Sequence, residues 1–170
     1  ENKSDITLSA GNTGALLIIS RMVLKMIDKI EKPALAGLWP NDYGMNVVLD
    51  LGANIECSET NLIHFCFMGS ALHKALFPDE EVNVALLNVG SEEIKGHDEI
   101  KKAYKFLKEN KMIDFEFTGY VEGNHITEGN VNVIVTDGFT GNIALKTAEG
   151  TANFIQKNLK ESINPLSLLF

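Results

Sequence analysis

Continuous apolar runs that alternate with helical patterns constrain the fold of this chain more than any other feature. The clearest run covers residues 47–51 and is partly β-branched, and similar runs cover residues 82–89, 115–118 and 131–135. Helical spacing or helix-capping residues mark the segments 16–30, 58–76, 98–110 and 140–162, with Ser58 or Thr60 expected to cap the second segment and Thr140 the last. Strands that are apolar throughout are typical of a parallel sheet buried on both faces. The sequence therefore predicts an α/β fold, with a mostly parallel sheet between two layers of helices.

The composition argues against a nucleic-acid-binding protein and against a disulfide-rich one. The 170 residues are 45% hydrophobic and carry a net charge of −8, which fits a single α/β domain spanning residues 1–170 and argues against a nucleic-acid partner. Two cysteines, Cys57 and Cys66, are too few for a disulfide scaffold, so a cytoplasmic setting is expected. Because the chain opens on Glu1 and a strand is predicted already at residues 6–8, we expect it to be part of a longer protein.

A glycine followed closely by an asparagine recurs where predicted strands end. The copies are Gly11-Asn12, Gly52-Ala53-Asn54 and Gly141-Asn142. The carboxyl ends of parallel strands share one edge of the sheet, and ligands bind at that edge in such folds. Glycine lets a backbone approach a ligand, a helix N-terminus favours anions, and an asparagine amide donates without repelling negative charge. A lone Gly-Asn pair is more often an ordinary turn, but the repetition favours an anion site.

Other residues add weaker indications. Lys95 follows a predicted strand and could neutralise a phosphate, although an arbitrary lysine is more often a solvated surface residue. Asp50 and Asp137 stand at strand ends, where they could orient a neighbouring asparagine or lysine, although lone carboxylates there more often cap a helix or brace a loop. The four histidines have no metal-ligand spacing and the dinucleotide-binding glycine motif is missing, so neither a metal nor a cofactor is expected.

Four ordered motifs resemble the PlsX family of bacterial phosphate acyltransferases. They lie at residues 9–15, at 49–54, at 86–90 with 92–96, and at 137–142 with 144–147. The resemblance implies transfer of a long acyl group from acyl carrier protein to inorganic phosphate in phospholipid synthesis. It also implies a homodimer and a fold related to the phosphate acetyltransferases. Members of the family are longer and carry an N-terminal motif that this sequence lacks.

The resemblance and the residue chemistry together predict roles for individual residues. Catalysis is assigned to two residues: Lys95 neutralises phosphate charge, and Asn142 donates to the oxyanion of the tetrahedral intermediate. Binding of phosphate or substrate is assigned to six residues, namely Ser9, Gly11, Asn12, Thr13, Asn54 and Gly141.

Alternatives stay open at this point. The acyl donor could be a coenzyme A thioester, or the chain could be a non-catalytic fragment that binds anions or dimerises. An acidic carrier protein would need a basic docking face, and two lysine-rich stripes qualify: Arg21, Lys25 and Lys29, or Lys101, Lys105 and Lys108. The apolar stripe near the C-terminus, with residues 166–170 after it, could pack on a core or dimer partner, or attach the protein peripherally to the inner face of the cell membrane.

Overall fold

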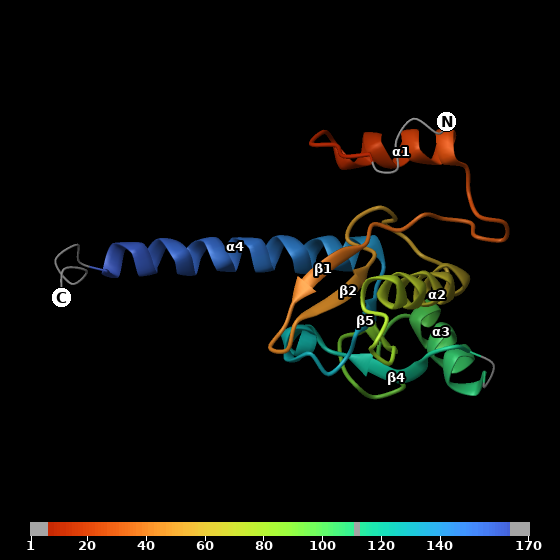
Figure 1. The fold of residues 1–170 in the computed structure, drawn as a ribbon. Helices are drawn as coiled ribbons and strands as arrows, with labels where there is room; N and C mark the ends of the chain where they lie inside the picture. The colour runs from red at the N-terminus through yellow and green to blue at the C-terminus, as the bar shows by residue number, and fades with distance from the viewer. Residues whose placement is uncertain (1–6, 111–112, 164–170) are drawn as a thin grey trace.

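The computed structural model describes residues 7–110 and 113–163, and these build one mixed sheet (Figure 1). Its strand order is β1-β2-β5-β3-β4. The four strands β2 (Met45–Leu49), β5 (Val133–Val135), β3 (Asn83–Leu87) and β4 (Glu116–Val121) run parallel. The edge strand β1 (Gly37–Pro40) pairs antiparallel with β2, and no sequence pattern predicted this orientation.

Helices cover both faces of this sheet, which confirms the predicted α/β class. Helices α2 (Glu59–Leu76) and α3 (Asp98–Glu109) pack on one face, over a core that includes Val47, Val84 and Val133. On the opposite face, Ile126 of the 3-10 helix η1 (Gly123–Glu128) and Leu145 of α4 (Gly138–Ser162) pack with the second core cluster. Alternate side chains of each parallel strand thus enter two separate apolar layers.

Side-chain caps fix where two of these helices begin. Of the two predicted caps, Ser58 is the one that starts α2, and it exchanges hydrogen bonds with Asn61 in a capping box. The prediction that Thr140 caps α4 is wrong. Asp137 is the cap, and its carboxylate accepts hydrogen bonds from the Thr140 backbone nitrogen at 2.7 Å and the Thr140 hydroxyl at 2.9 Å.

The first helix is shorter than its apolar spacing predicted. Helix α1 (Thr13–Leu24) begins at the N-cap Asn12, has no buried residue, and ends where Lys25 takes a φ of 63°. A second positive φ, 69° at Lys29, follows in the loop. Since neither lysine is helical, the prediction that Arg21, Lys25 and Lys29 share a helix face is wrong. The predicted strand at residues 6–8 is not formed by Thr7 and Leu8, and Ile6 lies outside the described residues.

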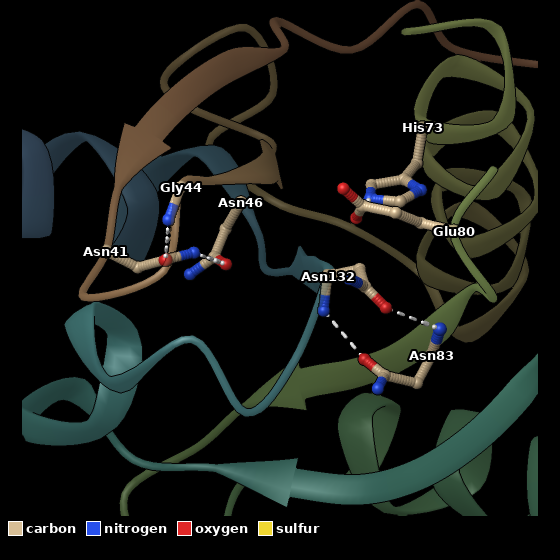
Figure 2. A network of polar contacts seen from close by, with 7 residues as sticks. All are labelled: Asn41, Gly44, Asn46, His73, Glu80, Asn83 and Asn132. Carbon is tan, nitrogen blue, oxygen red and sulfur yellow. Dashed lines mark hydrogen bonds and ion pairs between the residues drawn. The ribbon is translucent and has the colours of Figure 1, made fainter. Parts of the chain in front are cut away.

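A network of asparagine side chains closes the amino edge of the sheet (Figure 2). The backbone nitrogen of Asn83 donates to Asn132 Oδ1 at 3.1 Å, and the backbone nitrogen of Asn132 donates to Asn83 Oδ1 at 2.6 Å. Asn46, 1% exposed at the start of β2, donates from Nδ2 to the Ile126 carbonyl at 2.6 Å. The hydrogen-bonding groups at this edge are therefore paired within the protein. The loops predicted to bind a ligand lie at the opposite, carboxyl edge of the sheet.

Helix α4 projects well beyond the sheet (Figure 1). Only Gly138 and Gly141 are buried among its residues. Its remaining length exposes large apolar side chains, namely Phe139, Ile143, Phe154, Ile155 and Leu159. Over the described residues, no helix combines the length and apolarity that crossing a membrane would require.

Candidate functional site at the carboxyl edge

The loop after β2 is organised by Asp50, which is 0% exposed. Asp50 Oδ1 accepts hydrogen bonds from the backbone nitrogens of Gly52 at 3.0 Å and Ala53 at 2.9 Å, and Oδ2 accepts from that of Asn54 at 2.8 Å. Oδ1 also accepts from the backbone nitrogen of Leu35 at 3.1 Å, in the segment before β1. The carboxylate therefore fixes the Gly52-Ala53-Asn54 loop from within, as expected of a lone aspartate at a strand end.

The second and third Gly-Asn copies lie against each other, as their placement at one sheet edge predicted. Asn142 donates from Nδ2 to the Leu51 carbonyl at 3.4 Å, a long contact that leaves the amide capacity for another acceptor. A Cβ at Gly52, whose φ is +132°, would come within 2.7 Å of Asn142 Nδ2. A Cβ at Gly141 would come within 1.8 Å of the Asp50 carbonyl oxygen. Glycine is required at both positions for this approach.

Neither asparagine starts a helix, in contrast to the expected arrangement. Asn142 lies in the second turn of α4, and Asn54 lies in the loop before α2. The Nδ2 of Asn54 donates to both the Pro33 carbonyl and Asp50 Oδ2, each at 2.7 Å. Because an amide nitrogen has two protons, both donors of Asn54 are engaged within the protein. In this structure the Asn54 side chain braces the loop.

The first Gly-Asn copy, Gly11-Asn12, lies at the start of α1, and residues of α1 face the loop after β2 across a small cavity. Asn12 Oδ1 accepts a hydrogen bond from the Ala15 backbone nitrogen at 3.0 Å, and the Ser9 hydroxyl accepts one from the Gly11 nitrogen at 3.2 Å. A cavity of about 200 Å³ is lined by residues of α1 and of the loop after β2, including Thr13, Gly14, Gly52 and Ala53. Ser9, Gly11, Asn12 and Thr13 are all exposed.

Lys95 lies on a hydrogen-bonded turn after β3, which is two strands from β2 in the sheet. The Asn88 Nδ2 donates to the carbonyls of Gly90 at 3.2 Å and Lys95 at 3.1 Å. Glu93 holds the turn to α3 by accepting hydrogen bonds from Lys108 and Tyr104, and these bonds lower the pKa of Glu93. The Lys95 Nζ lies 3.6 Å from Glu92 Oε1 and its side chain is 47% exposed. Lys95 lines neither the small cavity nor the larger groove described next.

A groove of about 880 Å³ opens where three helices begin. Its lining includes the N-cap residues of α2, α3 and α4, which are Ser58, His97 and Asp137. Side chains cap α2 and α4, whereas His97 makes no capping hydrogen bond with the first turn of α3. Helix N-termini carry positive partial charge, but the groove is also lined by one lysine, Lys32, and by four carboxylates, those of Glu31, Glu56, Glu99 and Asp137, so its lining is mainly acidic. Sequence reasoning missed this groove, although capping residues after successive strands were a usable signal.

Cys57 lies on the wall of this groove and is half-buried. Burial raises the pKa of its thiol to about 11, and the nearby Asp50 carboxylate adds to the shift, while a hydrogen bond from the Gly138 backbone opposes it. At neutral pH the thiol is therefore protonated, and a protonated thiol is a poor nucleophile. Within the described ranges 7–110 and 113–163, no cluster of three or more histidine, cysteine, aspartate or glutamate side chains could hold a metal ion.

Comparison with protein-family models matches residues 1–168 to the family described as "Fatty acid synthesis protein". Among curated proteins, a phosphate acyltransferase of Pelagibacter ubique is 65% identical over 163 residues, covering 96% of this chain and 49% of the relative. A phosphate acyltransferase of Caulobacter vibrioides is 47% identical over 171 residues, covering 99% of this chain and 47% of the relative. The chain thus spans about half the length of the curated relatives it matches.

Among solved structures, a EutD phosphotransacetylase from Staphylococcus aureus has a similar fold. The TM-score is 0.59 at 16% sequence identity, and the match covers 79% of this chain and 46% of that one. At this identity the likeness establishes the architecture, which is the phosphate-acetyltransferase-like arrangement predicted from the sequence.

Proposed function

We propose that this chain, which belongs to the fatty acid synthesis protein family, is part of a phosphate acyltransferase. In the full-length protein, an acyl group passes from the thioester of acyl carrier protein to inorganic phosphate, and the acyl phosphate formed serves phospholipid synthesis. The observation that carries this proposal is the similarity of nearly the whole chain to relatives named phosphate acyltransferase.

The chemistry of the proposed reaction suits the residues at the carboxyl edge. A phosphate oxygen attacks the thioester carbonyl carbon, a C–O bond forms, the C–S bond breaks, and the thiolate leaves. Phosphate is an anion at neutral pH, so the site must mainly orient it and stabilise the oxyanion. The raised pKa of Cys57 favours direct attack by phosphate over an acyl-cysteine intermediate.

Each predicted site residue has a place in this proposal. The backbone and side chains of Ser9, Gly11, Asn12 and Thr13 bind phosphate at the start of α1, where helix N–H groups converge. Asn142 donates from its amide to the oxyanion. Gly141 permits the close approach that places Asn142, and Asn54 supports the phosphate site by bracing the loop.

Lys95 is proposed to neutralise phosphate charge, and its replacement tests this role. In the full-length protein, Lys95→Ala is expected to raise the KM for phosphate by about tenfold, because an exposed lysine acts as a partly screened point charge. Steady-state kinetics with varied phosphate measure the effect. Glu92→Gln is the control: it removes the neighbouring carboxylate without removing the cation, and the KM should not rise. An unchanged KM in Lys95→Ala would place Lys95 outside the site.

The identity of the acyl donor is tested by comparing two thioesters of the same acyl chain. The full-length protein is expected to form acyl phosphate at least ~10-fold more efficiently from acyl carrier protein than from coenzyme A, since protein–protein contacts add binding energy. Equal or higher efficiency with the coenzyme A thioester would reverse the assignment of the donor. Absence of acyl phosphate with both would leave an anion-binding or dimerising role.

The lysines of α3 are proposed to dock the carrier protein. Helix α3 carries Lys101, Lys105 and Lys108, and its first turn borders the groove. The other candidate stripe is not on one helix face, because Lys25 and Lys29 lie beyond the end of α1. Reversing charge with Lys101→Glu and Lys105→Glu is expected to raise the KM for acylated carrier protein by about fivefold and to flatten its salt dependence. Lys74→Glu is the matched control, because Lys74 lies roughly 20 Å along α2 from the groove. Equal KM values in both variants would reject this docking face.

Two further proposals concern assembly. The first is that the protein is a homodimer, in which a second copy covers the exposed apolar side chains of α4. The rest of the full-length protein is the other candidate to cover this helix. We also propose a cytoplasmic enzyme that attaches peripherally to the membrane, because its acyl phosphate product carries a long apolar chain. Residues 166–170, for which membrane contact was predicted, lie outside the described residues.

A further inference from the structure

Asp50 has no direct role in the chemistry described above, yet it connects both sides of the candidate site. Its carboxylate is 0% exposed and accepts five hydrogen bonds from described residues. Four of the donors belong to the loop after β2, namely the backbone nitrogens of Gly52, Ala53 and Asn54 and the Asn54 Nδ2. Oδ1 accepts three of the five bonds and Oδ2 accepts two, and since a carboxylate offers about four lone-pair sites, at least two donors share one of them.

The loop that Asp50 holds is the surface on which Asn142 lies. Asn142 Nδ2 donates to the Leu51 carbonyl at 3.4 Å, and it sits over Gly52, where a Cβ would approach it to 2.7 Å. From the other side, the Asp50 carbonyl oxygen abuts Gly141, the residue before Asn142, at a distance that leaves no room for a Cβ. Asp50 therefore contacts both the loop beneath the Asn142 amide and the backbone that carries it.

We propose that Asp50 is a positioning residue that sets the direction of the Asn142 amide, and through it the stabilisation of the oxyanion. This rests on the proposed function, in which Asn142 is the oxyanion donor. Asp50→Asn would replace one acceptor oxygen with an NH₂ group facing N–H donors of the loop, so these donors would lose their partner. The loop would shift, and a displaced donor stabilises the oxyanion poorly because catalysis is sensitive to about 1 Å of misplacement.

The kinetic test compares Asp50→Asn with a matched control in the full-length protein. Asn46→Ala is the control, since Asn46 is 1% exposed and hydrogen-bonded at the opposite end of the same strand. We expect Asp50→Asn to lower kcat by about 30-fold with the KM for phosphate within about threefold, and Asn46→Ala to leave kcat within about threefold. Combining Asp50→Asn with Asn142→Ala should lower kcat no further than Asn142→Ala alone, because coupled residues are not additive.

A second readout does not depend on turnover. With ¹⁵N-labelled asparagine, the side-chain amide resonance of Asn142, assigned by its loss in Asn142→Ala, should shift in Asp50→Asn and stay in place in Asn46→Ala. If Asp50→Asn does not fold, Asn54→Ala carries the test, because it removes one donor to Asp50 and should shift the same resonance.

The outcomes separate this inference from the proposed function. A wild-type protein that makes no acyl phosphate would contradict the proposed function, while the Asn142 resonance would still decide whether Asp50 positions that amide. An active wild type with equal kcat values in Asp50→Asn and Asn46→Ala, or fully additive effects with Asn142→Ala, would overturn the inference. An Asn142 resonance unmoved in the variants at Asp50 and Asn54 would overturn it as well.

Discussion

Replacing Asn142 with alanine in the full-length protein is expected to lower kcat/KM by about a hundredfold or more, with the fold retained. The amide of Asn142 makes a long hydrogen bond to the Leu51 carbonyl, at 3.4 Å, so its removal costs little stability but deletes the proposed oxyanion donor. Steady-state rates of acyl phosphate formation, with circular dichroism to verify folding, measure the effect.

Asn158→Ala is the matched control for this variant. Asn158 lies on the same helix and is exposed, and its Nδ2 donates to the Phe154 carbonyl one turn earlier. Its loss should leave kcat/KM within about threefold of wild type, as is usual for surface substitutions. If Asn142→Ala behaved like Asn158→Ala, Asn142 would not be the oxyanion donor.

Gly141→Ala is expected to have the largest effect on stability, lowering the free energy of unfolding by about 3 kcal/mol or more. The added Cβ would meet the Asp50 carbonyl oxygen at 1.8 Å and Thr136 Cγ2 at 2.9 Å. A backbone oxygen cannot rotate away as a side chain can, so α4 would have to move relative to β2. Urea denaturation measures the change.

Gly150→Ala provides the contrast on the same helix, since a Cβ there would meet nothing within 4 Å. Alanine has the higher helix propensity, so this variant should be more stable than wild type by up to about 1 kcal/mol. Equal stabilities of the two variants would mean that α4 does not pack on Asp50 as described, and the link from Asp50 to Asn142 would be lost with it.

The sequence predicted those elements whose signals are local and strong. Ser58 caps α2 because its side chain can satisfy the first turn by itself, and the apolar segment 47–51 gave the buried strand β2. The antiparallel edge strand β1 depends on pairing across the sheet, which no local pattern encodes. Helix α1 ends earlier than its apolar spacing predicted. It buries no residue, so no packing against the described part of the protein extends the helix beyond Leu24.

The candidate site was predictable in part. Strand ends and glycines indicated that Gly52, Gly141 and Asn142 would meet, and a lone Asp50 was expected to brace a loop; the structure has both features. The motif could not show that both amide protons of Asn54 are engaged, because one of them is donated to the carbonyl of Pro33, 21 residues earlier in the chain. The catalytic and binding roles of these residues stay predictions until variants are measured.

The most direct test of the proposed function follows labelled phosphate through the reaction. The full-length protein is mixed with acylated carrier protein and ³²P-labelled phosphate, and acyl phosphate and free carrier thiol are quantified together. We expect labelled acyl phosphate and free thiol in equal amounts, with both absent when phosphate is left out. Thiol release that is independent of phosphate and yields free fatty acid, or no consumption of the thioester at all, would contradict the assignment of this protein as a phosphate acyltransferase.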